Sequence, residues 1–373
     1  MNKTIGIFGG GQLGRMMAQA ALPLNLQCTF FETTTDCPAA QLGSVFSTQD
    51  PQGLQDFIAS ADVFSLEFEN TPVAYVDVLT QSKTLYPPRL ALATAQHRLA
   101  EKQLFDELKI PVAPYRAVDS VDSLKQAVTD LGLPIVLKTA TGGYDGKGQF
   151  VLRSVDQIGT AWAELGPAKS LIAESFVHFS REVSIIAVRG QTGEVKTWAL
   201  AENHHHHGIL SHSIVPAPNS AELEPVAQDY ITRLLNHLNY VGVLTLELFV
   251  TEQGLYANEM ACRVHNSGHW SIEGAICSQF ENHIRAVAGL PLGATDVVRP
   301  TVMINIIGQH PKTEDVLALN GAHLHLYNKS ERVGRKLGHI TLMPNQSEDL
   351  TALCRQLAKI LPVPLALTDR MTL

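Results

Sequence analysis

Two glutamates in the second half of the chain have a spacing that could hold a divalent cation. The apolar segments 244–250 (LTLELFV) and 254–263 (GLYANEMACR) are separated by a few turn residues, which predicts a β-hairpin. With the turn midway between them, Glu247 and Glu259 lie opposite each other on one face. Facing carboxylates repel, and a hard cation between them turns that cost into a binding site, whereas solvated glutamates on an outer face would not lie in such apolar strands. We therefore predict Mg²⁺ between these residues, with Asn258 on the same face only if the strand bulges there.

The segment 141–149 (TGGYDGKGQ) is a second candidate for chemistry. It connects two strand-like runs, carries Lys147 and follows a strand that contains Lys138. Its glycines match neither the P-loop pattern nor the dinucleotide pattern. Because so many glycines in a mere connection are entropically costly, we favour a lid over nucleotide phosphates rather than a glycine hairpin with a solvated lysine.

The glycines near the start of the chain predict an anion-binding turn. Gly9, Gly11 and Gly14 form G-x-G-x-x-G between an apolar run and a helical pattern, and Glu32 ends the next strand-like run. This arrangement is typical of dinucleotide-binding domains, in which the acid holds a ribose hydroxyl. A tight turn at a helix N-terminus suits any phosphate, so an NAD-dependent dehydrogenase and a site for another phosphorylated small molecule both stay open.

Four consecutive histidines at 204–207, in AENHHHHGIL, suggest either a metal site or a purification tag. A tag is excluded because the run lies in mid-chain. In an extended strand His205 and His207 point to one side while His204 and His206 point to the other. A single tight site formed by all four is therefore geometrically poor.

The elements that position these residues suggest several domains. Strand-like and helical runs alternate over the first 90–100 residues, which predicts a doubly wound parallel sheet, and a helical segment follows at 93–108. Antiparallel strands are expected in the middle of the chain, followed by short strands and a final helix after about residue 298. The expected fold class is therefore α/β and α+β. The expected domains are an N-terminal Rossmann-like domain (1–110), a lid (111–190), a central subdomain (191–298) and a small C-terminal mixed α+β domain (299–373).

The composition limits the partners of the protein. The 373 residues are 45% hydrophobic and 17% charged, which is typical of a folded chain without long disordered segments. The net charge of −8 argues against nucleic acid, and no apolar run approaches the roughly 20 residues that cross a membrane. The first residues show no signal-peptide pattern, and the five cysteines are odd in number and lack CxxC spacing. We therefore expect a cytoplasmic protein with buried thiols.

Together, these residues resemble the ATP-grasp superfamily and, more closely, the N5-carboxyaminoimidazole ribonucleotide synthetase family of purine biosynthesis. The motifs that carry the resemblance follow the family order as far as about residue 341: GGGQLGRM, LEFEN, AQHRLAEKQLFDEL, KTATGGYDGKGQ, ENHHHHGIL, NEMACRVHNSGHWSIEGAICSQFENH, GLPLG and GRKLGHIT. The resemblance implies an ATP-grasp fold and an ATP-dependent ligase that carboxylates 5-aminoimidazole ribonucleotide with bicarbonate through carboxyphosphate, releasing ADP and phosphate. It also implies one or two Mg²⁺ ions bound with ATP, and a homodimer.

The resemblance further implies roles for individual residues. Those expected to bind ATP are Arg98, Lys138, Gly143, Tyr144, Asp145, Gly146, Lys147, Gly148, Gln149, Glu174, Ser175, Phe176, Val177, Glu182, His205, Asn258 and Glu259. Those expected to bind the ribonucleotide are Gln12, Leu13, Glu67, Tyr144, Asp145, Arg263, His265, Asn266, Ser267, Lys329, Arg335 and Lys336. The expected catalytic residues are Arg263, His265 and Lys138, and the expected metal ligands are Glu247 and Glu259. In this assignment the backbone of residues 174–177 holds adenine, Glu182 binds the ATP ribose, and the first glycine turn binds the substrate phosphate and ribose.

Two positions depart from the family pattern. Cys262 stands where the family often has proline and His97 where an acid is common, and neither change removes a group that the chemistry needs.

Three other functions are alternatives. The formate-dependent glycinamide ribonucleotide transformylase has the same layout, but a serine-rich loop and Asp-Thr in place of Asn266-Ser267. The NAD-dependent dehydrogenase shares only the first glycine turn. A non-catalytic nucleotide sensor is disfavoured because the predicted metal and phosphate ligands are intact.

Overall fold

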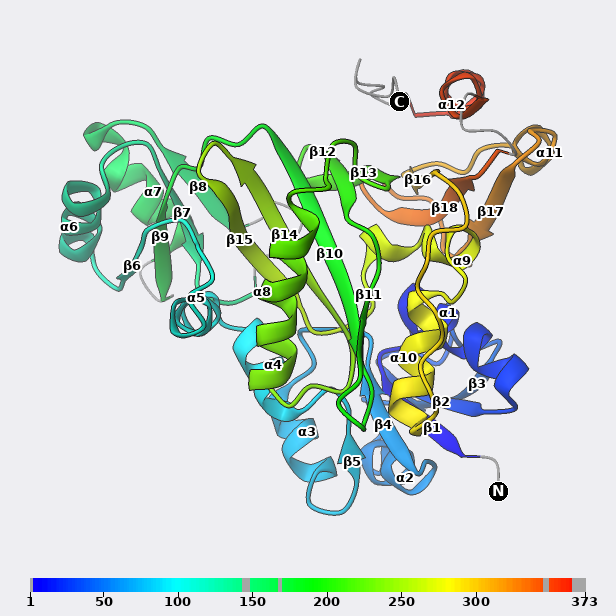
Figure 1. The fold of residues 1–373 in the computed structure, drawn as a ribbon. Coiled ribbons are helices and arrows are strands. Elements are labelled where there is room, and N and C mark those ends of the chain that lie inside the picture. The colour runs from blue at the N-terminus through cyan, green and yellow to red at the C-terminus, as the bar shows by residue number, and fades with distance from the viewer. Residues whose placement is uncertain (1–2, 143–147, 167–169, 345–348, 364–373) are drawn as a thin grey trace.

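The computed structural model describes residues 3–142, 148–166, 170–344 and 349–363 (Figure 1). The predicted contacts that lie outside these residues are those of Gly143, Tyr144, Asp145, Gly146 and Lys147. The described part of the chain forms three sheets, of five, four and nine strands. Within it, no helix has the length and apolar composition needed to cross a membrane.

A five-stranded parallel sheet forms the N-terminal domain, as predicted. Its order is β3 (Gly43–Ser47), β2 (Gln27–Glu32), β1 (Thr4–Phe8), β4 (Val63–Leu66) and β5 (Thr84–Leu85). Its helices are α1 (Gln12–Ala21), α2 (Gly53–Ala59), α3 (Val73–Leu79) and α4 (Arg89–Ala95), with the 3₁₀ turn η1 at Leu22–Leu24. The central strand β1 is almost wholly buried, which explains its continuous apolar run. The first glycine turn joins β1 to α1 at the carboxyl edge of this sheet.

A four-stranded antiparallel sheet forms the lid. Its order is β6 (Tyr115–Val118), β9 (Leu171–Ser175), β7 (Ile135–Thr139) and β8 (Gln149–Leu152). Helices α6 (Val121–Leu131) and α7 (Ile158–Leu165), with the 3₁₀ turn η2 (Val155–Gln157), belong to the same unit. The lid has a hydrophobic core of its own, which includes Leu124, Leu137 and Ala161. It lies at one end of the molecule, where α5 (Arg98–Glu107) separates it from the N-terminal domain (Figure 1).

The first turn of α6 allows a test of lid stability. Ser120 Oγ accepts a hydrogen bond from the Ser123 N–H at 3.1 Å, and Ser123 Oγ accepts one from the Ser120 N–H at 3.0 Å. Because loss of such a cap typically costs about 1 kcal/mol, Ser120→Ala should lower the unfolding free energy of the lid by about that amount. Thr129→Ala, at an exposed position of the same helix, should change it by less than about 0.5 kcal/mol. Urea unfolding measures both variants, and equal effects would contradict the capping role of Ser120.

The nine-stranded sheet carries most of the candidate site. Its order is β15 (Gly254–Ala261), β14 (Gly242–Thr251), β10 (Arg181–Arg189), β12 (Ala201–His206), β13 (Ile209–Val215), β16 (Thr301–Ile307), β18 (Lys336–Leu342) and β17 (Ala322–Leu326), with β11 (Val195–Thr197) paired to β10. The associated helices are α8 (Glu224–His237), η3 (Asn266–Gly268), α9 (Ser271–Gly274), α10 (Gln279–Ala288), α11 (Thr313–Leu317) and α12 (Asp349–Ile360).

Two parts of this sheet differ from the expected division into domains. β10 lies within the predicted lid range 111–190, yet it pairs with β14 and β12 and not with the lid strands. The strands of the range 299–373 extend the same sheet, because β16 pairs with β13. Both differences arise from pairings between segments that are distant in the sequence, which local patterns do not reveal.

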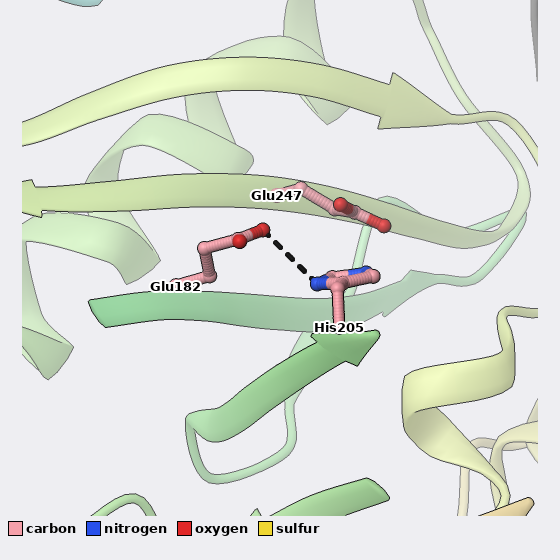
Figure 2. Close-up of side chains that lie close together, drawn as sticks. All are labelled: Glu182, His205 and Glu247. Carbon is pink, nitrogen blue, oxygen red and sulfur yellow. Dashed lines mark ion pairs between the residues drawn. The ribbon is translucent and has the colours of Figure 1, made fainter. Parts of the chain in front are cut away.

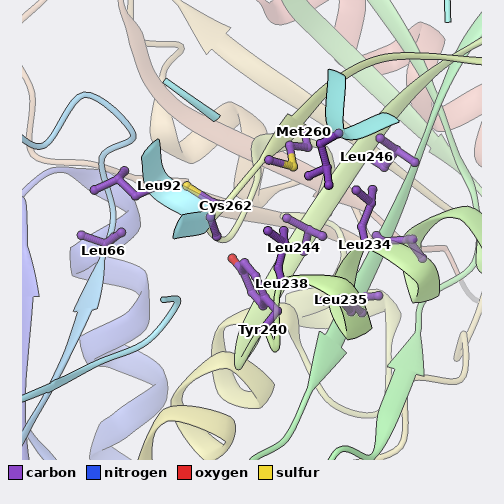
Figure 3. Packing of buried hydrophobic residues seen from close by; sticks show 14 of the residues in the cluster. Leu66, Leu92, Leu234, Leu235, Leu238, Tyr240, Leu244, Leu246, Met260 and Cys262 are labelled. Carbon is purple, nitrogen blue, oxygen red and sulfur yellow. The ribbon is translucent and has the colours of Figure 1, made fainter. Parts of the chain in front are cut away.

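A shared hydrophobic core joins the N-terminal domain to the nine-stranded sheet (Figure 3). Leu66 of β4 and Leu92 of α4 belong to the same buried cluster as Leu244 of β14 and Leu234 of α8. Cys262 is fully buried in this cluster, and burial raises the pKa of its thiol. The other four cysteines are also buried, unpaired thiols. This core holds the first glycine turn in a defined position relative to the strands that carry the paired glutamates.

Candidate active site

The paired glutamates have the register that the hairpin spacing predicts. β14 and β15 are antiparallel, and Glu247 lies opposite Glu259. The register then shifts, because Leu248 lies opposite Ala257, and Asn258 becomes the extra residue of a β-bulge. This bulge is the feature that Asn258 needs in order to share the face of the two glutamates.

The electrostatics of the pair favour a bound cation. Burial tends to raise the pKa of Glu247, but the hydrogen bond and charge of His265 outweigh this effect and lower that pKa to about 2. Burial and the charge of Glu247 raise the pKa of Glu259. Because the charge of Glu247 disfavours ionisation of Glu259, a cation between them relieves the repulsion. Carboxylate oxygens also fit a hard ion such as Mg²⁺.

His265 is held in one orientation beside Glu247. Its Nε2 lies 3.1 Å from Glu247 Oε1. Its Nδ1 accepts a hydrogen bond from the Ser267 N–H at 3.3 Å and lies 2.9 Å from Ser267 Oγ. Nε2 therefore donates to Glu247. The neighbouring Asn266 exchanges amide hydrogen bonds with Asn305 at 3.0 and 2.7 Å.

A chain of buried polar side chains extends from His265 across the sheet. Ser184 Oγ donates to Ser267 Oγ at 2.8 Å and accepts from Asn203 Nδ2 at 2.9 Å, while Ser213 Oγ donates to Asn203 Oδ1 at 2.7 Å. These four residues are at most 5% exposed, and a fully bonded buried network of this kind rigidifies its surroundings. Sequence reasoning missed Ser184 and Ser213. The available signal was strand alternation, because Ser184 lies two residues after the predicted Glu182.

The predicted adenine and phosphate contacts of the lid lie on neighbouring strands. Lys138 Nζ donates to Glu174 Oε2 at 2.7 Å. The N–H groups of Ser175 and Phe176 already donate to carbonyls of two prolines, at 2.8 and 3.2 Å. Any hydrogen bond from the segment 174–177 to adenine must therefore come from its other backbone groups, such as those of Val177.

Three further predicted ATP contacts flank the same region. Arg98 Nη1 lies 3.2 Å from Glu259 Oε2. This arginine therefore lies beside Glu247 and Glu259, the predicted metal ligands, which are called the metal pair below. Gln149 begins β8 and lies opposite Lys138 of β7, and Gly148 immediately precedes it. Cationic groups of α5 and of the lid thus lie in the region where nucleotide phosphates are expected.

The four histidines do not follow one extended strand. His207 and Gly208 form the two-residue loop between β12 and β13, and both have positive φ (50° and 77°), as in a type I′ turn. The register also shifts between His204 and His205, because Ser211 of β13 is the extra residue of a β-bulge there. The prediction that His205 and His207 share a strand face is therefore wrong, because His207 lies in the turn. The His204 ring stacks on His212, with 4.4 Å between the ring centroids.

His205 faces two other predicted site residues, Glu182 and Glu247 (Figure 2). His205 Nδ1 lies 3.2 Å from Glu182 Oε2, and one ligand atom from each of the three residues lies within 4.8 Å of the others. Burial tends to lower the pKa of His205, but the hydrogen bond and charge of Glu182 outweigh it and raise that pKa. This cluster could hold a metal ion, or it could present a cationic imidazole to a nucleotide phosphate.

Replacing single histidines of the run tests which of them functions. Because a hydrogen bond to a charged group contributes about 1.5–3 kcal/mol, His205→Ala should lower kcat/KM for ATP by about ten- to a hundredfold. His206→Ala removes an exposed ring and should change it by less than about twofold. Steady-state ADP release measures both variants. Equal, small effects would mean that His205 is the wrong histidine or has the wrong role.

Glu67 occupies the start of α1 much as a phosphate would. Its carboxylate oxygens accept from the Gly11 N–H at 2.6 Å and the Gly14 N–H at 2.5 Å, and Glu32 accepts from the Gly10 N–H at 3.0 Å. A Cβ at Gly11 would lie only 2.5 Å from Glu67 Oε1, so this close approach requires glycine. A dinucleotide pyrophosphate would have to displace this carboxylate, and the geometry therefore argues against the dehydrogenase alternative.

Lys329 reaches the first glycine turn from the far end of the sequence. Its Nζ donates to Gln12 Oε1, and burial lowers the pKa of Lys329 to about 8. An open hollow of about 500 Å³ beside it is lined by residues that include Arg15 and His310. The Leu13 side chain is buried in the core, so any ligand contact of Leu13 comes from its backbone.

The other two members of the predicted basic cluster lie apart. Arg335 Nη1 donates to Ser330 Oγ at 2.9 Å, and Ser330 lines the hollow beside Lys329. Lys336 begins β18, and its charge contributes to the low pKa of Glu247. The cluster therefore extends from the hollow toward the metal pair.

Arg263 links the two halves of the site electrostatically. Its Nε lies 3.3 Å from Glu69 Oε1. Burial tends to lower the pKa of Arg263, but the charges of Glu69, Glu67 and Glu247 act in the other direction and the net effect raises it. Arg263 thus interacts electrostatically with Glu67 at the first glycine turn and with Glu247 of the metal pair. Sequence reasoning missed Glu69, although it lies two residues after Glu67 in the LEFEN motif.

Three parts of the chain match known domain families. Residues 1–96 match the ribonucleotide synthetase preATP-grasp domain, residues 103–280 the ATP-grasp domain, and residues 301–353 the phosphoribosylaminoimidazole carboxylase C-terminal domain. The lid, the nine-stranded sheet and the paired carboxylates thus define a protein of the ATP-grasp class.

Relatives that match nearly the whole chain identify the family within this class. The chain is 46% identical over 340 residues to N5-carboxyaminoimidazole ribonucleotide synthase of Pseudomonas aeruginosa, with 91% of this chain and 94% of the relative covered. It is similar to the crystal structure of N5-carboxyaminoimidazole ribonucleotide synthetase from Thermus thermophilus, with a TM-score of 0.92, 44% identity and coverage of 96% and 99%. The N5-carboxyaminoimidazole synthase from Aspergillus clavatus in complex with ADP and 5-aminoimidazole ribonucleotide gives a TM-score of 0.89, 28% identity and coverage of 96% and 98%. This chain belongs to the N5-carboxyaminoimidazole ribonucleotide synthase family, which confirms the family predicted from its motifs.

Proposed function

We propose that the protein carboxylates 5-aminoimidazole ribonucleotide with bicarbonate and ATP, giving N5-carboxyaminoimidazole ribonucleotide, ADP and phosphate, in purine biosynthesis. The observation that carries the proposal is the position of Arg263. It follows β15, the strand that carries Glu259, and its Nε lies 3.3 Å from Oε1 of Glu69, two residues after Glu67. A nucleotide bound over the metal pair and a ribonucleotide bound at the first glycine turn would meet at this residue. Family membership supports the same reaction.

The nucleotide half of the site would bind ATP through charge neutralisation. Arg98 and Lys138 would contact the phosphates, His205 would add a further cationic group, and Glu182 would accept from the ribose hydroxyls. Glu247, Glu259 and Asn258 would hold one or two Mg²⁺ ions, which when bound neutralise charge on the phosphates. The register that places Glu247 opposite Glu259 supports this role, since carboxylates are the ligands that such an ion prefers.

The ribonucleotide half would bind the substrate at the first glycine turn. Lys329 and Arg335 would contact the phosphate, with Gln12 between the phosphate and the ribose. Glu67 already uses one lone pair of each oxygen on the turn, and its remaining lone pairs are free to accept from ribose hydroxyls. Tyr144 and Asp145 would then lie near the imidazole.

The chemistry has two balanced steps. A bicarbonate oxygen attacks the γ-phosphorus while the bond to the β–γ bridging oxygen breaks, which gives carboxyphosphate and ADP. The exocyclic amine then bonds to the carboxyl carbon, phosphate leaves, and the amine loses one proton. Arg263, held by Glu69, would stabilise the negative charge on carboxyphosphate. Both ring nitrogens of His265 are already engaged, so we assign it the role of orienting Glu247.

We further propose that the protein acts as a cytoplasmic homodimer, as the family resemblance implies. Sedimentation equilibrium of the purified protein tests the assembly. Twice the mass of one chain would support the homodimer, and the mass of a single chain across the tested concentrations would contradict it.

An ADP-release assay with two substrate pairs tests the function. Purified protein is given ATP and Mg²⁺ with either 5-aminoimidazole ribonucleotide and bicarbonate, or glycinamide ribonucleotide and formate. We expect turnover with the first pair only. Turnover only with the second pair would favour the transformylase, and NADH binding without ATP turnover would favour the dehydrogenase.

A further inference from the structure

Two buried ionisable residues of α5 face the strand that carries Glu259. Glu101 and Lys102 are each only 2% exposed. α5 packs against β15, which is the outermost strand of the nine-stranded sheet, and lies below the lid in Figure 1. An edge strand presents N–H and C=O groups without strand partners, and these groups need other partners when a helix covers them.

The two side chains bond to the backbone on either side of Glu259. Lys102 Nζ donates to the Asn258 carbonyl at 2.7 Å. Glu101 Oε1 accepts from the Met260 N–H at 2.7 Å. The β-bulge lies at this point of β15. α5 therefore fixes the carbonyl before Glu259 and the N–H after it, and these groups set the direction in which the Glu259 side chain points.

Lys102 also connects this strand with the lid. Its Nζ lies 3.9 Å from Glu174 Oε1, and the other carboxylate oxygen of Glu174 accepts from Lys138 at 2.7 Å. Burying an ammonium group costs several kcal/mol unless it is paired, so satisfying a strand edge in this way is expensive. Neutral side chains could satisfy the same backbone groups at lower cost. A purely structural role therefore leaves the choice of two ionisable side chains at this edge without a reason.

We propose that Glu101 and Lys102 are positioning residues that clamp the β-bulge so that Glu259 points at Glu247 and the pair can bind Mg²⁺. Without the clamp, mutual repulsion would let the bulged strand turn one carboxylate away from the other. The proposal rests on the proposed function only in requiring that the glutamate pair binds the metal of a nucleotide. Its effect is preorganisation, because the ligands are aligned before the ion arrives.

The Mg²⁺ dependence of ADP binding tests the clamp without requiring turnover. Calorimetric titration of the full chain gives the Kd for ADP in EDTA and in saturating Mg²⁺, and their ratio measures the metal's contribution. Lys102→Met removes the ammonium but keeps most of the side-chain length. Because loss of groups that orient metal ligands typically costs about 10–100-fold in metal affinity, we expect the ratio to fall by about tenfold or more. The Kd in EDTA should stay within about twofold of the unsubstituted protein, because Lys138 keeps its bond to Glu174.

Matched variants separate positioning from general stabilisation. Lys83→Met removes a similar bond, from Nζ to the Ala61 carbonyl at 2.7 Å in the N-terminal domain, and should lower the melting temperature without changing the ratio. Glu101→Gln keeps the accepting oxygen and should retain the ratio of the unsubstituted protein. Glu101→Met should lower the ratio as Lys102→Met does. If Lys102→Met does not fold, Glu101→Met provides the test of the clamp instead.

One result overturns the clamp. If Lys102→Met or Glu101→Met folds with a lower melting temperature but an unchanged ratio, the two residues only stabilise the fold. Failure of the unsubstituted protein to carboxylate 5-aminoimidazole ribonucleotide would instead contradict the proposed function. The binding ratio would still decide the clamp in that case, so the two failures are distinguishable.

Discussion

Glu259→Gln is expected to abolish Mg²⁺-dependent turnover, with a fall in kcat of about a thousandfold or more. Glutamine has nearly the shape of glutamate but lacks the charge that a hard cation requires. In the unsubstituted protein the charge of Glu247 raises the pKa of Glu259, because the two carboxylates repel. The substitution removes this repulsion, so the fold should persist. ADP release measured over a range of Mg²⁺ concentrations gives kcat and the metal dependence together.

Glu252→Gln is the matched control for this experiment. Glu252 lies in the exposed turn of the same hairpin, and its substitution should leave kcat within about twofold of the unsubstituted protein. Thermal melting checks that both variants are folded. Near-normal activity of folded Glu259→Gln at saturating Mg²⁺ would remove the paired-carboxylate metal site.

Lys138→Met is expected to lower kcat/KM for ATP by about a hundred- to a thousandfold. Lys138 is a largely buried cation of the lid, and Glu174 holds its amine toward the region where phosphates are expected. Methionine keeps the packing of the stem but cannot neutralise phosphate charge. Because the ribonucleotide half of the site lies elsewhere, KM for 5-aminoimidazole ribonucleotide should change by less than about threefold.

Lys125→Met controls for the loss of a lysine from the lid. Lys125 lies on the exposed face of α6, where it pairs with Asp122, and its substitution should leave both kinetic parameters unchanged. Steady-state kinetics with each substrate varied in turn measures all of these values. A rise of similar size in both KM values for Lys138→Met would indicate a general disturbance of the protein and not a lost phosphate contact.

Local patterns predicted the elements that depend on short-range physics. The apolar run and glycines at the start of the chain predicted β1, the turn and α1, and the spacing of 244–263 predicted that Glu247 lies opposite Glu259. Both predictions succeeded because strand alternation and turn chemistry act over a few residues. Asn258 was expected on the face of the two glutamates only if its strand bulges there, and the structure contains this bulge.

Other features depend on contacts that no local pattern encodes. Lys329 meets Gln12 from the far end of the chain, and β10 joins the nine-stranded sheet through β14 and β12. The histidine run was misread because its last member forms a tight turn with Gly208. The helical segment predicted at 93–108 gave no sign that Lys102 is buried against a strand edge. Long-range pairing and burial decide each of these cases.

Isotope transfer from bicarbonate tests the central claim most directly. The protein is supplied with ATP, Mg²⁺, 5-aminoimidazole ribonucleotide and bicarbonate labelled with ¹³C and ¹⁸O, and both products are analysed by mass spectrometry. Because a bicarbonate oxygen attacks the γ-phosphorus, we predict one ¹⁸O atom in each phosphate released and the ¹³C in the carboxyamino group of the product. Phosphate without ¹⁸O, formed while ATP is consumed, would contradict the account, because water or another acceptor would then have taken the phosphoryl group.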